Sequence, residues 1–295
     1  MEIKRTKRMK EYLTPVGVVS APRTGSTFIW QCVFTMIAGT CRFYNDSSGN
    51  PDMKFFNHIT GGKWGIPDLL HGHKNNWLDV NEGKFELTWL TPTGEEVSET
   101  CWWDIVITER NFIDSYLSLI RVGLNDNDMF LKLINKEETL LSRVDEYRDQ
   151  LQYIEYLKAE YKGRILTLQY EKFANNYDYI FEKFQSFFIR DTFPWKLVLN
   201  DKIKNLMIEG TKRERNIKVQ ETVEKDFGGN TSGLHKRHIW SNKINYSKDI
   251  LTEKNYNRLL EEFAPEKIIP ARNVTDEYLQ NVEDRGGKEI VTVNE

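Results

Sequence analysis

Three short apolar runs, each followed by a segment with helical spacing of apolar residues, constrain the fold of this chain most strongly. The runs are residues 15–20 (PVGVVS), 102–108 (WWDIVIT) and 164–168 (RILTL). A short apolar run bounded by turn or polar residues is typical of a buried strand. The segment after the first run has Ile29, Val33, Met36 and Ile37 on one helical stripe. Strands that alternate with helices predict an α/β fold, a three-layer sandwich with a central parallel sheet and helices on both faces.

The remaining segments predict smaller elements around this frame. These are a short strand at 68–73, a hairpin of 85–90 and 96–100, and a long polar helical region at 127–162. A further helix turns Ile180, Phe181, Phe184 and Phe188 inward, and a last helix is marked by Tyr256, Leu259, Leu260 and Phe263. Two stretches have a turn-rich or basic composition. Residues 41–68 are predicted to be irregular, and residues 211–243 are predicted to form a mobile loop.

The length and the hydrophobic content fit one large domain. Of the 295 residues, 39% are hydrophobic, which is enough for a sizeable packed core. We expect an N-terminal extension over 1–13, a single catalytic domain over 14–270 and a C-terminal tail over 271–295.

Charge and cysteine usage narrow the classes of partner and the compartment. With 41 Lys and Arg against 44 Asp and Glu, the net charge of −3 argues against a nucleic-acid binder. Three cysteines, Cys32, Cys41 and Cys101, are an odd and sparse set that fits a reducing compartment. Neither a signal peptide nor an apolar stretch of membrane-spanning length is seen. We therefore expect a cytoplasmic protein with no membrane partner.

The first candidate site is the loop after the first strand, residues 20–27 (SAPRTGST). A Walker A loop has a glycine at its first position and a lysine after the second glycine, but here Ser20 takes the first position and Ser26 follows Gly25. What remains is a shorter anion cradle of backbone N–H groups, hydroxyls and the cation Arg23 at a helix start. An ordinary strand–helix turn is the alternative.

The second candidate site is the pair Arg110 and Ser118. Arg110 ends the second core strand, and Ser118 lies eight residues later in the following helix. Since the carboxyl ends of parallel strands share one crevice, Arg110 is expected to face the loop that holds Arg23. The alternative is a surface arginine that pairs with Glu109 or Asp114.

The third candidate site is the segment 230–237 (NTSGLHKR). Flexible backbone at Gly233 beside the cations Lys236 and Arg237 suits a clamp that closes on phosphate. A solvated basic loop is the alternative.

These elements, in this order, resemble the sulfotransferase superfamily that uses 3′-phosphoadenosine 5′-phosphosulfate (PAPS). Residues 22–28 (PRTGSTF) resemble the family's 5′-phosphosulfate loop, with Arg23 where the cytosolic branch has lysine. Arg110 and Ser118 match the 3′-phosphate pair at the same spacing. Tyr170 matches a tyrosine that lies near the adenine in relatives, and residues 230–236 resemble the family's C-terminal Gly-x-x-Gly-x-x-Lys loop, with Asn230 for the first glycine.

The resemblance implies a P-loop-NTPase-like sulfotransferase fold and a role for each matched residue. Cofactor contacts fall on Arg23, Thr24, Gly25, Ser26, Thr27, Phe28, Arg110, Ser118, Tyr170, Gly233, Lys236 and Arg237. The reaction implied is transfer of a sulfuryl group from PAPS to a hydroxyl, or secondarily an amine, of a small-molecule or carbohydrate acceptor. The product would be adenosine 3′,5′-bisphosphate (PAP), and no metal is required.

The base that accepts the acceptor proton is the most open assignment. Residues 70–73 (LHGH) resemble a Lys-Thr-His stretch of cytosolic members, which puts His73 on the catalytic position and His71 in place of the lysine. The resemblance thus gives His73 and Arg23 as the catalytic residues. Other branches use a carboxylate. A packing role for the two histidines is the alternative, and a metal site is disfavoured because the pattern has no third ligand nearby.

Two other functions fit parts of the pattern. A P-loop phosphotransferase for a nucleoside or small molecule would need ATP and Mg²⁺, and a non-catalytic module would bind the nucleotide without turnover. The acceptor and the oligomeric state are not specified by the sequence.

Overall fold

The core of the molecule is a four-stranded parallel sheet. The computed structural model describes residues 16–48, 69–72, 84–90, 96–102, 104–124, 126–189, 198–212 and 245–268. The strand order in the sheet is β2 (Leu69–Gly72), β1 (Val16–Val19), β5 (Asp104–Glu109) and β6 (Ile165–Gln169). Every pairing in this sheet is parallel. The predicted α/β class with a parallel sheet is therefore confirmed, and the C-terminal ends of β1 and β5 lie at one edge.

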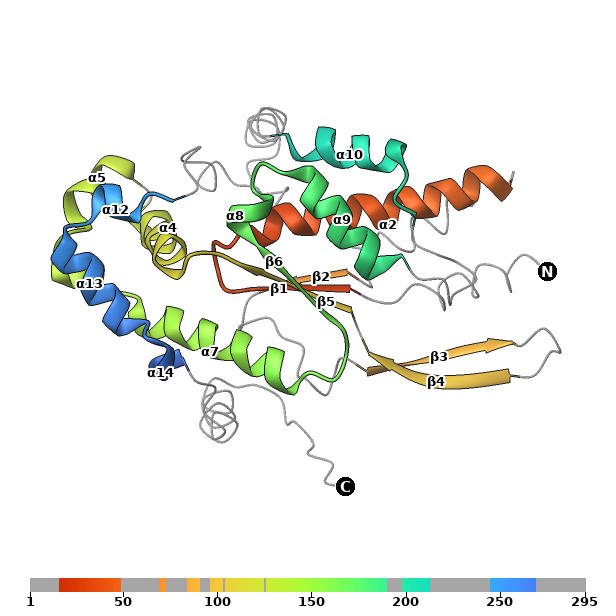
Figure 1. Cartoon of the computed structure of the whole chain (residues 1–295), viewed down its shortest axis with the longest axis horizontal. Helices are drawn as coiled ribbons and strands as arrows, with labels where there is room; N and C mark the ends of the chain where they lie inside the picture. Colours follow the sequence, from red (N-terminus) through yellow and green to blue (C-terminus); the bar gives the residue numbers. More distant parts are fainter. Residues whose placement is uncertain are drawn as a thin grey trace, which may run out of the picture.

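Alternate residues of the strands supply two hydrophobic clusters. Val106 belongs to one cluster, whereas its neighbours Ile105 and Ile107 belong to the other. Since successive side chains of a strand point to opposite faces, the clusters lie on the two faces of the sheet. The first cluster is completed by α2 (Ser26–Ser48), α8 (Tyr170–Phe173), α9 (Tyr177–Phe188) and α10 (Asp201–Thr211). Figure 1 shows α9 and α10 above the sheet and α7 below it.

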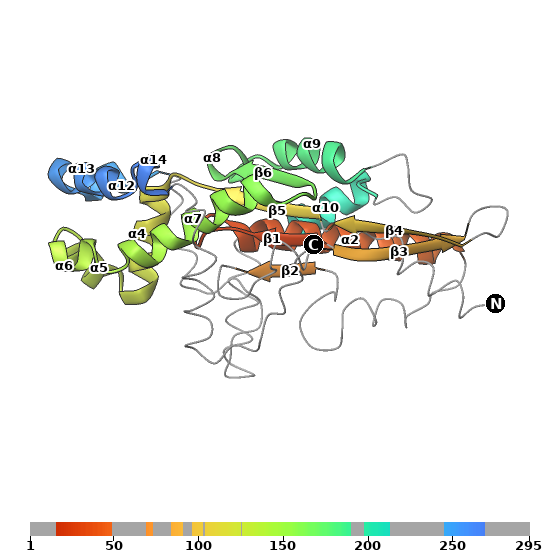
Figure 2. The same ribbon diagram turned by 90° about the horizontal axis from the view of Figure 1, so that it is seen from below.

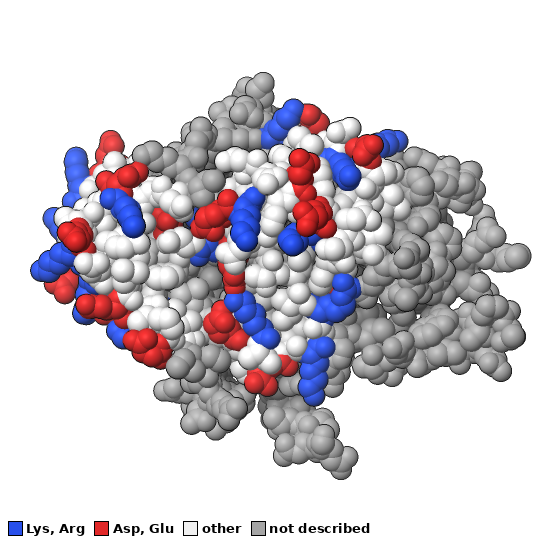
Figure 3. Space-filling view, in the orientation of Figure 1, with Lys and Arg blue, Asp and Glu red and all other residues white. Residues whose placement is uncertain are grey.

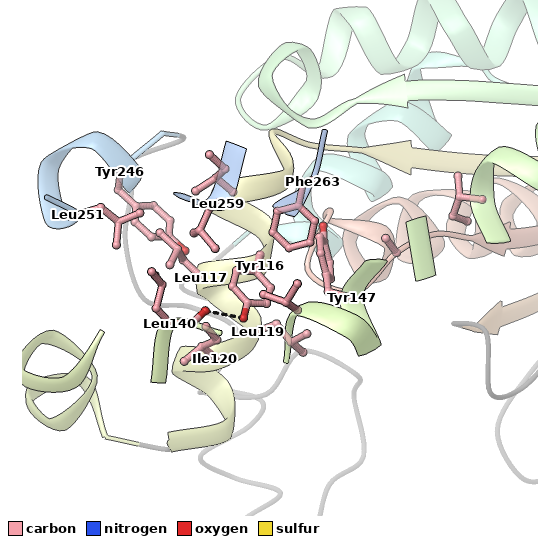
Figure 4. Close-up of a cluster of buried hydrophobic side chains, with 14 of the residues drawn as sticks. Tyr116, Leu117, Leu119, Ile120, Leu140, Tyr147, Tyr246, Leu251, Leu259 and Phe263 are labelled. Carbon is pink, nitrogen blue, oxygen red and sulfur yellow. Dashed lines mark hydrogen bonds between the residues drawn. The ribbon is translucent and has the colours of Figure 1, made fainter. Parts of the chain in front are cut away.

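The second cluster joins α4 to the C-terminal helices. It draws on α4 (Phe112–Leu124), α5 (Asn127–Leu133), α6 (Glu137–Leu140), α7 (Val144–Glu160), α12 (Ser247–Ile250), α13 (Glu253–Glu262) and α14 (Pro265–Ile268). At its centre the rings of Tyr116, Tyr147 and Phe263 lie 5.1–5.6 Å apart, and the Tyr116 hydroxyl donates to the Leu140 carbonyl at 2.7 Å (Figure 4). Residues 245–268 thereby hold α4, the helix that carries Ser118.

A separate hairpin completes the described strands. As predicted, β3 (Lys84–Leu90) pairs with β4 (Glu96–Trp102) in an antiparallel two-stranded sheet. In Figures 1 and 2 this hairpin lies at the opposite end of the molecule from α5 and α13.

The structure corrects several predicted boundaries. The first helix does not end near residue 40 but continues to Ser48, since residues 41–48 hold neither Pro nor Gly, the two residues that interrupt a helix most strongly. Trp102 pairs with Lys84 in β4, so β5 begins only at Asp104. The predicted long helical region at 127–162 is three helices. The predicted last helix is present as α13, on which Leu260 is 40% exposed, and α10 was not predicted.

The domain division into 1–13, 14–270 and 271–295 stays a prediction. Beyond Lys212, the predicted mobile loop lies outside the described residues. Among the helices that the structure describes, none combines the length and the apolar character needed to cross a membrane.

Candidate anion-binding site

Buried hydroxyl groups anchor the loop between β1 and α2 to the neighbouring strand β5. The Ser20 hydroxyl accepts hydrogen bonds from both the backbone N–H and the hydroxyl of Thr108 on β5, each at 2.8 Å. Thr24 donates to the carbonyl of Ala21 at 2.9 Å, and its hydroxyl lies 2.7 Å from that of Thr108. These three hydroxyl residues are at most 2% exposed. A fully bonded buried network of this kind fixes the loop to the end of β5.

The backbone of the loop is strained at Arg23. Its φ is 71°, and Arg23 is the only non-glycine residue with positive φ among those the structure describes. Such a conformation persists only where surrounding contacts impose it, and it clusters at functional sites. The contacts here are with both flanking carbonyls: Ser115 donates to the Pro22 carbonyl at 2.8 Å, and Arg110 donates to the Arg23 carbonyl at 3.4 Å. Gly25, with φ of 88°, completes the turn.

The loop delivers the chain into the first turn of α2. The Gly25 carbonyl accepts from the N–H groups of Phe28 and Ile29 at 3.1 and 3.2 Å, which starts the helix. Ser26 is buried and Thr27 is partly buried at its first turn. Backbone N–H groups and the positive end of the helix dipole meet here, so this end of α2 favours an anion.

The structure brings the first two predicted motifs together. The Arg23 guanidinium donates from Nε to the Ser118 hydroxyl at 3.1 Å, across 95 residues of sequence. Arg110 reaches the same loop through the Arg23 carbonyl. The expected approach of Arg110 to the Arg23 loop is therefore confirmed.

Aromatic rings line the side of this cluster. The Arg110 guanidinium lies 4.4 Å from the centre of the Tyr170 ring and 5.7 Å from that of Tyr246. Phe173 contacts both predicted aromatic residues, with its ring 5.4 Å from Tyr170 and 5.9 Å from Phe28. The predicted Tyr170 thus holds Arg110 by a cation–π contact as well as lying beside the loop.

The carboxylates named as alternative partners of Arg110 make other contacts. Glu109 forms an ion pair with Lys158 on α7. Asp114 is buried and accepts the backbone N–H of Tyr246 at 2.9 Å. Both carboxylates therefore have structural roles beside the site.

Positive charge is concentrated at this site. Burial is the main effect that lowers the pKa of Arg23, the neighbouring charges of Arg121 and Arg110 act in the same direction, and the resulting pKa is about 10. Arg121 lies on α4 one turn after Ser118 and is 6% exposed. On the described surface in Figure 3, by contrast, Lys and Arg are interspersed with Asp and Glu. Arginines gathered in a poorly solvated site strengthen the attraction for an anion.

Arg121 was missed by sequence reasoning because it belongs to none of the motifs. The available signal was its spacing: it follows Ser118 by three residues, which puts both on one helix face.

Four predicted site residues lie outside the described residues: His73, Gly233, Lys236 and Arg237. The backbone of β2 ends at Gly72, which pairs with Val19 at the end of β1. No group of three or more His, Cys, Asp or Glu side chains that could hold a metal is found among the described residues.

Comparison with known proteins finds similarity in structure. No family model matches the chain, and no curated protein matches it. The structure is similar to the crystal structure of mouse sulfotransferase SULT7A1 complexed with PAP, with 13% identity, a TM-score of 0.47, and coverage of 92% of this chain and 89% of that one. At this identity and TM-score the likeness carries no functional inference, so function is inferred from the side chains of the site.

Proposed function

We propose that this protein is a sulfotransferase with the three-layer, P-loop-NTPase-like fold of that superfamily, and that it uses PAPS as its sulfuryl donor. The observation that carries the proposal is the contact of Arg23 with Ser118, beside Arg110, at the N-terminus of α2. Two motifs that the family places on the two phosphate groups of PAPS meet in one cationic cluster.

The loop is proposed to bind the 5′-phosphosulfate end. Backbone N–H groups at residues 25–27, with the hydroxyl groups of Ser26 and Thr27, would surround that anion at the helix start. The Thr24 hydroxyl, which bonds to Ala21 and Thr108, would hold the loop in place. Phe28 and Tyr170 would flank the adenine.

The 3′-phosphate is proposed to bind at Arg110 and Ser118. A guanidinium offers a planar pair of N–H donors to phosphate, a geometry that lysine cannot copy. Gly233, Lys236 and Arg237 would close over the nucleotide from the later segment.

The transfer itself is proposed to be a direct in-line displacement. The acceptor oxygen forms a bond to sulfur while the bond from sulfur to the bridging phosphate oxygen breaks, and PAP leaves. Negative charge that builds on the bridging oxygen would be stabilised by Arg23 and the loop N–H groups. The acceptor proton passes to a base, assigned to His73 because that residue follows β2, whose C-terminal end lies beside the end of β1. This scheme needs no metal, and the acceptor is a small molecule or a carbohydrate, met in the cytoplasm.

Nucleotide binding is the first test. Calorimetry with PAP, adenosine 5′-phosphate and ATP with Mg²⁺ should show a preference for PAP. Arg110→Ala should weaken PAP binding about 10–150-fold, the equivalent of about 1.5–3 kcal/mol for a charge-assisted contact, with little effect on adenosine 5′-phosphate. Arg143→Ala is a matched control, because Arg143 pairs with Glu146 on the surface. A preference for ATP would instead indicate a phosphotransferase.

Sulfuryl transfer is the second test. Labelled PAPS with a panel of hydroxyl and amine acceptors should yield a labelled product, whereas PAP binding without product from any acceptor would indicate a non-catalytic module. His73→Asn should lower turnover about 10²–10⁴-fold and leave PAP affinity intact. Full activity in His73→Asn would move the base to a carboxylate.

A further inference from the structure

One face of α4 contacts the loop at successive turns, and Arg121 extends this face beyond the predicted motif. Ser115 donates to the Pro22 carbonyl, and Ser118 accepts from Arg23. Arg121 is the next residue at the same three-residue spacing. Long side chains on a helix lean toward its N-terminus, which carries the stem of Arg121 over the turn that holds Ser118.

Arg121 is buried near the junction of α4 and α5. The residue is 6% exposed, its Nη1 donates to the amide oxygen of Asn127 at 3.2 Å, and burial lowers its pKa. Tyr246 lies near both arginines. Its ring centre is 5.7 Å from the Arg110 guanidinium, and, although burial raises the pKa of its phenol, the charges of Arg110 and Arg121 both act to lower that pKa.

The electrostatic repulsion among Arg23, Arg110 and Arg121 supports a common role in binding an anion. After burial, the charge of Arg121 is the strongest influence that lowers the pKa of Arg23, and Arg110 acts in the same direction. Holding three guanidinium groups together in a poorly solvated place opposes folding. A ligand with two negative charges would relieve this repulsion, and groups with perturbed pKa values gather at functional sites for such reasons.

From this arrangement we infer that Arg121 is a third cationic residue of the nucleotide site, which binds the 3′-phosphate with Arg110 and Ser118 and makes the site selective for a terminal, doubly charged phosphate. The inference rests on the proposed use of PAPS. It adds to that proposal a specificity residue outside the matched motifs. A purely structural role, in which Arg121 joins α4 to α5 through Asn127, is the competing explanation.

The experiment compares two nucleotides that differ only in the 3′-phosphate. Full-length wild-type protein, Arg121→Met and Arg121→Lys are titrated calorimetrically with PAP and with adenosine 5′-phosphate at one ionic strength. Arg121→Met should bind PAP about 10–150-fold more weakly, the range of a lost charge-assisted contact, and adenosine 5′-phosphate within about threefold of wild type. Arg121→Lys should recover part of the loss, because it keeps the charge and loses the planar fork.

Two controls separate binding from structure. Arg143→Met makes the same change at a partly exposed surface ion pair and should leave both affinities unchanged. Asn127→Ala removes the Asn127 contact and leaves the charge, so PAP binding should fall far less than in Arg121→Met. The melting temperature of ligand-free Arg121→Met should equal or exceed that of wild type, because a repulsive charge has been removed.

The outcomes distinguish this inference from the proposed function. If Arg110→Ala loses PAP selectively and Arg121→Met does not, the role of Arg121 is refuted while the proposed function stands. Equal losses for both nucleotides, with a lower melting temperature, would also refute it in favour of the structural role. If wild-type protein does not bind PAP, both proposals fail. Should Arg121→Met not fold, Arg121→Lys decides alone: a selective loss for PAP supports the inference, and unchanged affinity refutes it.

Discussion

Replacing Gly25 by alanine tests how closely the anion-binding loop packs against the aromatic rings beside it. With φ of 88°, Gly25 has a backbone conformation that L side chains rarely adopt. A Cβ atom added there would lie 2.8 Å from Cδ2 of Tyr170 and 2.9 Å from Cζ of Phe173. Phe173 is 1% exposed and belongs to the core, so its ring has little room to move.

Three contributions set the expected magnitude. A left-handed conformation costs a residue with a Cβ about 1–2 kcal/mol, and overpacking against fixed rings costs about 1–3 kcal/mol. The smaller backbone entropy of alanine in the unfolded chain returns about 0.5–1 kcal/mol. Gly25→Ala should therefore lower the free energy of unfolding by about 1–4.5 kcal/mol.

Urea denaturation measures this change, with Gly123→Ala as the matched control. Gly123 is an exposed residue of α4, and its added Cβ would meet only Arg143 Nη1 at an ordinary 3.7 Å. The same substitution should be neutral or stabilising there by up to about 1 kcal/mol, because alanine is the better helix former.

The sign of the difference between the two variants decides the question. If Gly25→Ala is as stable as Gly123→Ala, then the rings of Tyr170 and Phe173 do not confine the loop, and the account of its rigidity is wrong. Weaker PAP binding by a stable Gly25→Ala variant would instead place the effect in the loop conformation alone.

Three further predictions concern strain, titration and the support of α4. Arg23→Gly should leave the ligand-free protein as stable as wild type, or more stable by up to about 1–2 kcal/mol, because the positive φ costs glycine nothing. If urea denaturation shows that the free energy of unfolding falls by more than about 1 kcal/mol, the strain at Arg23 is contradicted. Burial raises the pKa of Tyr246 to about 12 and raises the pKa values of Tyr116 and Tyr147 as well. In the unfolded chain these phenols have a pKa near 10, so they ionise at a lower pH there than in the folded protein, and stability is lost as the pH rises above about 10. The free energy of unfolding should therefore be lower at pH 11 than at pH 8, and equal values would refute the burial of these rings. Asp114→Ala should cost about 2–4 kcal/mol in urea denaturation, because the buried N–H groups at the start of α12 lose their acceptor; Asp114→Asn should cost less, and equal costs would show that the acceptor oxygen is not what matters.

The sequence predicted the parts of the site that depend on local pattern and on sheet topology. The run at 15–20 and the helical stripe after it required only apolar periodicity, and the approach of Arg110 to the loop followed from the rule that parallel strands end at one edge. The positive φ of Arg23 could not be predicted from the sequence, since arginine seldom adopts a positive φ. The tertiary contacts from Ser115 and Arg110 impose this conformation.

Contacts between segments far apart in the sequence also could not be predicted. Arg121 carries no motif, and its meaning depends on the position of Arg23, which is set by tertiary packing. Tyr246 reaches Asp114 across 132 residues, a pairing that no local pattern indicates. The extra turns of α2 were missed because turn-forming residues were weighted above the absence of Pro and Gly.

The attachment of residues 245–268 to α4 has a consequence for the order in which the protein becomes functional during synthesis. The four described strands of the sheet and the loop after β1 have all been made once β6 has left the ribosome. The carboxylate of Asp114, however, accepts from the backbone N–H groups of Tyr246 and Ser247, which follow Asp114 by 132 and 133 residues. Until then the ring of Tyr116 also lacks the cover of Phe263. A nascent chain that ends before residue 245 would therefore expose an aromatic surface and present Ser118 on a helix without these contacts, so the proposed site would be complete only after residues 245–268 have been made.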